Sequence, residues 1–208
     1  MKKLALTMVF MIEPLLCVSG SPTFDGIYTG IGVGYNSLEN TITRVNGSNV
    51  SNASQKFSRP FLSIFFGSGK TSNTFPIYWG GEISISISKA DKKEVNLNNE
   101  KYIIGDSGLS SAFHFRLAYN SLVAPSLLLF LKFGISYNKA TSEYNSASLN
   151  CSKLGPTFGG GIEQKYGNIS YRLDAHITMD REKKNDMRSL KRGVNWGVQL
   201  SASYYTNF

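Results

Sequence analysis

The chain has 208 residues, a formal net charge of +8 and 41% hydrophobic residues, with a mean hydropathy of −0.15. The length suggests one domain, or one domain and a leader. Such a hydropathy is typical of soluble proteins, yet it does not exclude a membrane β-barrel, which hides its apolar face in residue-by-residue alternation. The basic residues form no stripe with stacking aromatics, which argues against nucleic-acid binding; anionic lipopolysaccharide or a host surface suits the charge equally well.

Residues 1–20 have the organisation of a secretory signal peptide. Two lysines open the segment, a mainly apolar stretch follows, and small residues precede a cleavage point expected before Ser21. We therefore expect residues 21–208 to form the exported domain. A lipoprotein anchored at Cys17 is disfavoured, because the residue before this cysteine is a large leucine. Cys17 would leave with the leader, so Cys151 would be alone and could form neither an intrachain disulfide nor a cysteine metal site.

The first half of the exported region contains four segments in which apolar residues alternate with small or polar ones. Such alternation predicts β-strands, because successive side chains of a strand point to opposite faces. We expect strands at 25–36, 57–67, 77–90 and 109–121, with polar or charged loops at 37–56, 67–76 and 91–106. Large apolar residues occupy both faces of the second segment, so which face meets lipid is left open. Gly69-Lys70-Thr71 resembles part of a phosphate-binding loop, but Ile64 stands where that loop requires glycine, so we expect a turn.

The second half continues the pattern with four more predicted strands. We expect them at 127–137, 155–166, 169–179 and 193–208, with tight turns at 123–125 and 167–168 and polar loops at 138–154 and 180–192. Eight strands whose connections alternate long and short predict an antiparallel up-and-down barrel with long outer loops and short periplasmic turns. The predicted fold class is therefore all-β, an eight-stranded transmembrane barrel after a signal peptide.

The distribution of charge decides which face of the barrel meets lipid. Charged residues share their phase with glycine and serine, whereas the opposite faces are nearly free of charge. An Arg or Lys that faces lipid near the midplane costs about 2–4 kcal/mol, and an apolar face this continuous would form an unusually large patch in water. We therefore expect the apolar faces to point outward, the reverse of a soluble lipocalin-like barrel.

The last segment, GVNWGVQLSASYYTNF, alternates over its whole length. One of its faces carries Val194, Trp196, Val198, Leu200, Ala202, Tyr204, Thr206 and the final Phe208. This segment resembles the last strand of bacterial outer-membrane β-barrels, whose terminal phenylalanine is recognised by the barrel-assembly machinery. By this resemblance, the assembly signal consists of Trp196, Leu200, Tyr204 and Phe208.

Over residues 21–208, the architecture resembles small outer-membrane barrels of the opacity or OmpA-transmembrane type. This resemblance implies a location in the outer membrane of a Gram-negative bacterium. It also implies the partners of such barrels: outer-membrane lipid and lipopolysaccharide, the barrel-assembly machinery and a host surface ligand. A role in adhesion or as a surface antigen follows only from this analogy of fold.

The inward phase of the predicted strands gathers three acids, three bases and two histidines. They are Glu82, His114, Arg116, Lys132, Glu163, Arg172, Asp174 and His176. The predicted heights along the strands pair Glu82 with Arg116, Glu163 with Arg172, and Lys132 with Asp174. An eight-stranded interior is only wide enough for side chains, and buried charges must pair. We interpret the set as a neutral salt-bridge plug, with a small passive pore as the alternative.

The expected loop 180–192 is strongly basic. Its candidates for contact with lipopolysaccharide phosphates or acidic host glycans are Arg181, Lys183, Lys184, Arg188, Lys191 and Arg192; the alternative is a solvated loop without a ligand. Lipid A deacylases of this size use a His and a Ser two residues apart on the lipid-facing surface. Neither His114 nor His176 has a serine two residues on, and both share the inward phase. We predict a non-enzymatic surface protein without catalytic residues, metal or cofactor; the alternatives are a passive pore, a structural envelope protein and a lipid A-modifying enzyme.

Overall fold

The structure of the chain, a computed structural model, describes residues 24–46, 49–72, 74–97, 100–120, 126–144, 147–179, 182–185 and 188–206. Within these ranges the chain forms eleven β-strands, and no helix there is long and apolar enough to cross a membrane. In chain order the strands are β1 Gly26–Asn46, β2 Asn49–Thr71, β3 Ile77–Ser88, β4 Asp91–Leu97, β5 Glu100–Asn120, β6 Leu127–Tyr144, β7 Ala147–Tyr166, β8 Ile169–Met179, β9 Glu182–Asn185, β10 Arg188–Arg192 and β11 Val194–Thr206.

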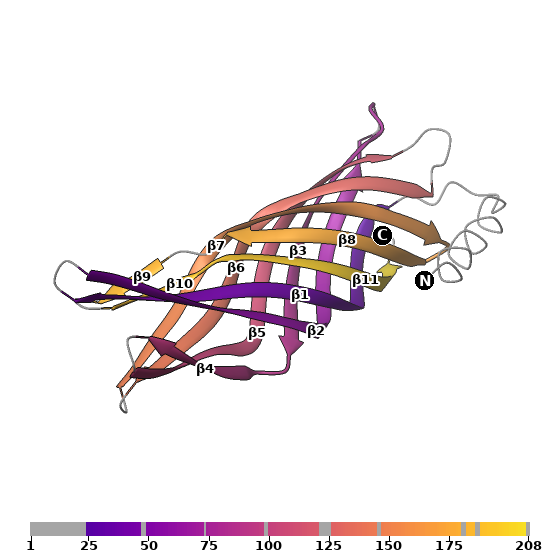
Figure 1. Cartoon of the computed structure of the whole chain (residues 1–208). Helices are drawn as coiled ribbons and strands as arrows, with labels where there is room; N and C mark the ends of the chain where they lie inside the picture. Colours follow the sequence, from indigo (N-terminus) through magenta and orange to yellow (C-terminus); the bar gives the residue numbers. More distant parts are fainter. Residues whose placement is uncertain are drawn as a thin grey trace, which may run out of the picture.

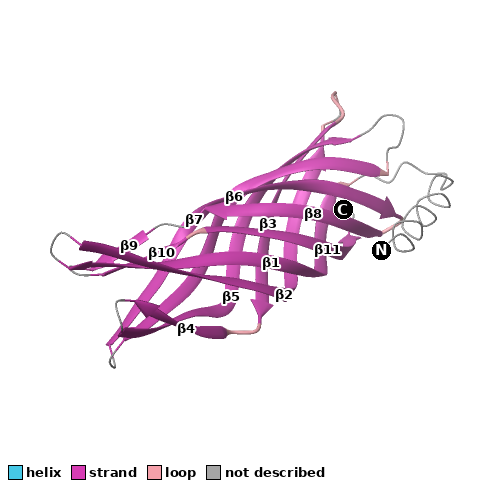
Figure 2. Ribbon diagram, viewed as in Figure 1, coloured by secondary structure: helices cyan, strands magenta, loops and turns pink. Residues whose placement is uncertain are grey.

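Eight of these strands close into one antiparallel barrel (Figures 1 and 2). Their order around the wall is β1-β2-β3-β5-β6-β7-β8-β11, and the ladder between β11 and β1 completes the circle. Along β11, outward and buried side chains alternate from Val194 to Thr206. The outward residues of the barrel strands are mainly apolar, whereas charged side chains such as Arg116 and Arg172 are buried inside. The predicted eight-stranded barrel with outward apolar faces is confirmed.

The orientation of β2 is decided by the glycines of its neighbour β1. Phe61 and Phe65 point into the barrel and are buried, whereas the alternate apolar side chains of β2 face outward. In the ladder between the strands, Gly30 stands opposite Phe65, and Gly34 stands opposite Phe61. A Cβ atom at either glycine would lie 2.4 Å from the facing ring. The glycines of β1 therefore make the room that the two inward rings occupy.

The prediction of long outer loops at 37–56, 91–106, 138–154 and 180–192 is wrong, because most of these residues belong to strands. β1 and β2 continue as one hairpin through the first segment, and β4 and the start of β5 form another in the second. Inward side chains of both hairpins build a second apolar core, which consists of Ile42, Phe57, Val95, Leu97, Tyr102 and Ile104. Exposed polar residues outnumber these apolar ones, so the composition of the segments is that of a loop although their structure is not.

The expected turn at Gly69-Lys70-Thr71 is also wrong, because these residues form the end of β2. The ladder with β3 continues to Thr71, which stands opposite Tyr78. The Tyr78 hydroxyl occupies the space beside Gly69 that a side chain would need. The backbone N–H of Thr71 donates to the Asp25 carboxylate at 2.5 Å, so this end of the strand is tied to the first described residues of the chain.

Of the two predicted tight turns, the one at 167–168 joins β7 to β8 as expected. Gly167 has a φ of +55°, a left-handed conformation that glycine adopts without steric cost. The predicted leader 1–20, the turn 123–125 and the terminal Phe208 lie outside the described residues, so these remain predictions. Cys151 belongs to β7.

At the end away from the short turns, the wall separates into two sheets, β9-β10-β1-β2 and β4-β5-β6-β7 (Figure 1). A proline lies at each point of separation. The β2–β3 ladder ends at the pair Phe61 and Ser88, and Pro60 is the neighbour of Phe61 on the side where the ladder stops. The β7–β8 ladder begins at Thr157, the residue that follows Pro156. Because proline has no N–H to donate, neither ladder continues through it. The two sheets and the second core between them are called the outer sandwich below.

Candidate functional site in the barrel interior

Aromatic side chains fill the end of the barrel that carries the short turns. This aromatic plug consists of Phe24, Tyr28, Phe65, Tyr78, Phe130 and Tyr205, packed with Ala118 and Leu128. Phe24 lies edge-on to both Tyr78 and Tyr205, with ring centroids 6.4 and 6.0 Å apart. The first described residue of the chain is thus a central part of the plug.

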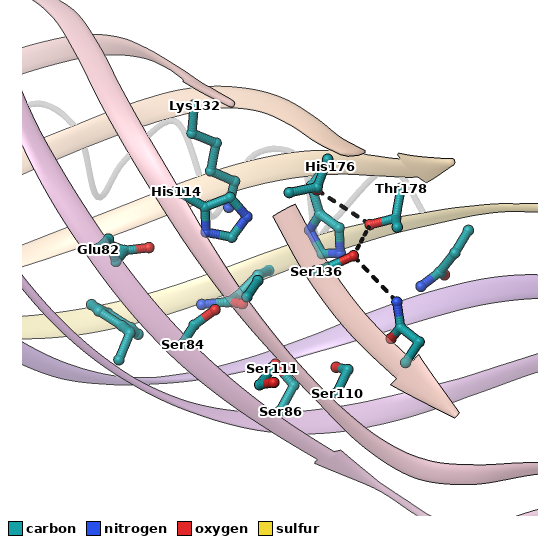
Figure 3. Close-up of a pocket in the computed structure, with 16 residues that line it drawn as sticks. Glu82, Ser84, Ser86, Ser110, Ser111, His114, Lys132, Ser136, His176 and Thr178 are labelled. Atoms are coloured by element: carbon teal, nitrogen blue, oxygen red, sulfur yellow. Dashed lines mark hydrogen bonds between the residues drawn. The ribbon is translucent and has the colours of Figure 1, made fainter. Parts of the chain in front are cut away.

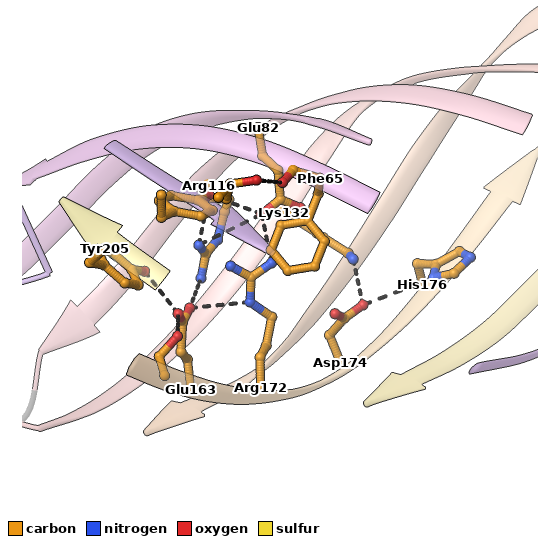
Figure 4. A network of polar contacts seen from close by, with 12 residues as sticks. Phe65, Glu82, Arg116, Lys132, Glu163, Arg172, Asp174, His176 and Tyr205 are labelled. Atoms are coloured by element: carbon orange, nitrogen blue, oxygen red, sulfur yellow. Dashed lines mark hydrogen bonds and ion pairs between the residues drawn. The ribbon is translucent and has the colours of Figure 1, made fainter. Parts of the chain in front are cut away.

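Two arginines and two glutamates form a closed ring of charge beside the aromatic plug (Figure 4). Arg116 Nη2 lies 2.6 Å from Glu163 Oε2, and Arg116 Nη1 lies 3.9 Å from Glu82 Oε2. Arg172 Nη1 lies 2.6 Å from Glu82 Oε2, and its Nε lies 3.2 Å from Glu163 Oε2. The four side chains are at most 4% exposed. In this ionic ring each arginine contacts both carboxylates.

Hydroxyl groups donate further hydrogen bonds to the carboxylates of the ionic ring. Tyr28 donates to Glu82 at 2.9 Å while it accepts a hydrogen bond from an arginine of the ring. Tyr205 and Ser170 donate to Glu163 Oε1 at 2.8 and 2.6 Å. These contacts connect the ring to β1 and β11, in addition to β3, β5, β7 and β8, which carry the charges.

Aromatic rings take the place of solvent around the two guanidinium groups. The Arg116 guanidinium lies 4.3 Å from the centroid of the Phe130 ring, and that of Arg172 lies 4.7 Å from the centroid of Phe65. At these distances the face of each ring attracts the cation. The ionic ring and the aromatic plug are therefore one packed unit.

A second charged layer lies on the outer side of the ring. Lys132 Nζ donates to Asp174 Oδ1 at 2.5 Å, and His176 Nδ1 lies 4.0 Å from the same oxygen. A polar cavity of about 40 Å³ adjoins this layer (Figure 3). Its walls include His114, His176, Ser84, Ser86, Ser110, Ser111, Ser136, Asn138, Thr157, Thr178, Asn195 and Gln199. A cavity of this volume has room for only a few water molecules.

A third pair, Arg59 with Asp106, lies between the cavity and the outer sandwich. Arg59 also donates to the carbonyl oxygen of Lys89 at 2.7 Å, and Asp106 accepts from the N–H of Gly108 at 2.9 Å. The sequence prediction missed this pair, because it assigned Asp106 to a loop. The sequence signal for this pair is the position of Arg59 two residues from Phe61, which puts both side chains on the inward face of β2.

The structure brings the predicted interior residues together inside the barrel. The pairs Glu82–Arg116, Glu163–Arg172 and Lys132–Asp174 lie 3.9, 3.2 and 2.5 Å apart. His114 and His176 line the cavity. In the described ranges, no three His, Cys, Asp or Glu side chains are placed to share a metal ion.

The other predicted site residues lie apart from this interior. Trp196, Leu200 and Tyr204 of the expected assembly signal face outward from β11, and Phe208 is outside the described residues. The basic residues of segment 180–192 are distributed over β9, with Lys183 and Lys184, and β10, with Arg188, Lys191 and Arg192. Arg181 lies outside the described residues.

A closed antiparallel barrel with an apolar exterior and buried charges belongs to the class of transmembrane β-barrels of outer membranes. A family model described as "outer membrane protein beta-barrel domain" matches residues 4–191. The chain belongs to this family, and its location is the outer membrane of a Gram-negative bacterium. The finer opacity-type relationship stays a prediction.

The chain also matches solved structures at low sequence identity. The attachment invasion locus protein Ail of Yersinia pestis is 12% identical, with a TM-score of 0.41 over 86% of this chain and 99% of that chain. Ail in complex with the heparin analogue sucrose octasulfate matches with 12% identity and a TM-score of 0.44 over the same shares. Neisserial surface protein A, NspA, is 11% identical, with a TM-score of 0.44 over 85% of this chain and 97% of that chain. No curated protein sequence matches the chain.

Proposed function

We propose that this protein is a non-enzymatic surface barrel, closed to solutes, that acts through its outer sandwich. The observation that carries the proposal is the succession of obstructions along the lumen. The aromatic plug and ionic ring come first, the pair Lys132–Asp174 second, and the pair Arg59–Asp106 third. The ionic ring and the second layer together contain three acids and three bases, whose charges balance, which suits a filled interior better than an ion-selective passage.

Opening such a lumen would require the separation of buried ion pairs. Removal of one partner of a buried pair costs about 3–5 kcal/mol. Because Arg116 and Arg172 each contact both glutamates, neither can move aside without breaking two contacts. The positions of the histidines also support a role without catalysis. His114 and His176 line an interior cavity, whereas acyl chains of membrane lipids lie outside the barrel.

Planar-bilayer recordings test whether the lumen is closed. We expect the folded wild-type protein to give no reproducible channel, and heat-modifiable migration on gels establishes that the reconstituted protein is a folded barrel. The variant Arg59→Ala/Arg116→Ala should give openings that wild type lacks, whereas Lys56→Ala, an exposed change, should not. A reproducible open channel in the wild-type protein would contradict the proposal. It would favour the small passive pore, for which the polar cavity is the supporting observation.

The ligand expected for the outer sandwich is an acidic polysaccharide of the envelope or of a host surface. The nine residues of β9 and β10 include five bases and one acid, and a surface of one sign attracts ligands of the other. Retention on an immobilised sulfated polysaccharide at rising salt measures this contact. The variant with Lys183, Lys184 and Arg188 replaced by glutamine should elute at lower salt than the control with Lys56, Lys92 and Lys101 replaced. If both variants elute at the same salt concentration, the retention depends only on the net charge of the protein, and β9 and β10 are not the binding surface.

A further inference from the structure

Two basic side chains lie next to the same carboxylate oxygen in the second charged layer of the barrel. Lys132 Nζ donates to Asp174 Oδ1 at 2.5 Å, and His176 Nδ1 lies 4.0 Å from that oxygen (Figure 4). Lys132 belongs to β6 and reaches β8 across Gly159 of β7, where a Cβ atom would lie 2.9 Å from its Cε. Asp174 and His176 are two residues apart on β8, so both point into the barrel.

The imidazole of His176 is held within reach of Asp174 by the neighbouring strands. A Cβ atom at Gly197 of β11 would lie 2.7 Å from the ring, and the Phe61 ring of β2 meets it edge-on with the centroids 6.3 Å apart. Asp174 Oδ2 accepts no hydrogen bond from the part of the chain that the structure describes. The carboxylate can therefore accept a hydrogen bond from His176 after a small movement of either side chain.

The charges around the adjoining polar cavity leave Asp174 as the carboxylate to which a new cation can bind. The charged and titratable groups that line this cavity are Glu82 from β3, His114 from β5, Lys132 from β6 and His176 from β8 (Figure 3). The described lining residues from β2, β7 and β11 are uncharged. Glu82 already contacts both arginines of the ionic ring. Among the described residues, Asp174 has only Lys132 as an ion-pair partner while His176 is neutral.

We propose that Asp174 exchanges Lys132 for His176 when this cavity takes up a proton from the surrounding water. A neutral imidazole cannot compete with an ammonium group for a carboxylate, but a protonated imidazole is a cation that donates from both nitrogens. It forms a charge-assisted hydrogen bond to Asp174 and repels Lys132, whose ammonium group turns into the hydroxyl-lined cavity. The proton stays on His176, and the step makes and breaks only hydrogen bonds.

The exchange makes the interior of the barrel sensitive to acid. Each exchange binds one proton, so the ratio of the exchanged to the original arrangement rises about tenfold for each pH unit by which the pH falls. The second obstruction of the lumen is then loosened, while the ionic ring and the aromatic plug keep their own contacts. The inference goes beyond the proposed function, because a closed lumen does not require an acid response, and neither does ligand binding by β9 and β10.

Solution NMR of the untagged protein in micelles tests the exchange, because His114 and His176 are the two histidines of the chain. The imidazole carbon signals report protonation, and the Nζ signal of Lys132 reports its partner. In wild type we expect the Lys132 signal to change with the same midpoint as the protonation of His176. His176→Gln should abolish this change, whereas the matched control His114→Gln should retain it. Heat-modifiable migration at each pH shows that the barrel is folded.

A second variant tests the competition from the other side. With Lys132→Met there is no lysine to displace and no like charge beside the ring, so His176 should bind its proton about tenfold more tightly than in wild type, or more. The exposed change Lys56→Met should leave this affinity unchanged. Equal proton affinity of His176 in Lys132→Met and in wild type would overturn the proposal. A Lys132 signal that stays unchanged until the barrel unfolds, or that still responds in His176→Gln, would overturn it as well.

Discussion

Replacement of Arg116 by alanine tests whether the interior of the barrel is dry. The guanidinium group is fully buried, lies 2.6 Å from Glu163 and 3.9 Å from Glu82, and packs on the Phe130 ring. Without it, two carboxylates would share the single cation of Arg172. Loss of one partner of a buried ion pair costs about 3–5 kcal/mol, whereas a pair exposed to water contributes under about 1 kcal/mol. We expect Arg116→Ala to lower the free energy of unfolding by the larger amount.

Urea unfolding of the protein in lipid vesicles measures this free energy. The control Lys56→Ala, at an exposed position of β2, should leave it nearly unchanged. The double variant Arg116→Met/Glu163→Gln removes one charge of each sign and leaves Arg172 paired with Glu82 at 2.6 Å. It should therefore recover much of the loss, because the charges that remain in the ionic ring balance again. Equal, small effects of Arg116→Ala and Lys56→Ala would refute the dry interior and would favour a water-filled lumen.

Three further changes test other parts of the structure. Gly30→Val should destabilise the barrel by about 1–3 kcal/mol through overpacking, because a Cβ atom there would lie 2.4 Å from the Phe65 ring and 2.5 Å from the carbonyl oxygen of Ala202; a free energy of unfolding equal to that of wild type would contradict this close approach. Phe57→Ala should open the outer sandwich to trypsin at Lys56 while heat-modifiable migration of the barrel persists, so unchanged protease resistance would count against a separate outer core. Deletion of Phe208 should reduce outer-membrane assembly and leave export intact; equal amounts of folded protein in the outer membrane would contradict an assembly role.

The barrel strands were predictable because each residue faces one of two very different surroundings. The prediction of a strand at 169–179 agrees with β8, Ile169–Met179. Outward positions meet lipid and inward positions meet a packed polar interior, so the alternation of residue types is strict. The same alternation predicts the ionic pairs, because a residue's position along its strand fixes its height in the barrel. The closure of the four charges into a ring was not predictable, since it depends on side-chain reach across the lumen.

The outer sandwich escaped prediction for a different physical reason. Both faces of its hairpins carry polar residues, and its core needs only one or two apolar side chains from each strand. Phe57 and Val95 pack in the same cluster although the rest of β2 and the whole of β3 separate them in the sequence. Such a core depends on long-range contacts, and local periodicity gives no sign of it. The missed pair of Arg59 and Asp106 has the same origin, because one partner lies in a segment with the composition of a loop.

The opening of the wall beside β2 coincides with the level at which the outward tyrosine Tyr35 stands. Inside a bilayer every backbone polar group must be paired within the protein, so a transmembrane barrel has to be closed there. Pro60 faces Tyr35 in the ladder with β1. It is also the neighbour of Phe61, at which the ladder with β3 ends. An outward tyrosine and a proline thus lie at one height. The amphipathic ring of tyrosine suits the membrane interface, and proline lacks the N–H that a further ladder would need. We therefore expect the lipid to end where the outer sandwich begins, because water can pair the backbone groups of its strand edges there.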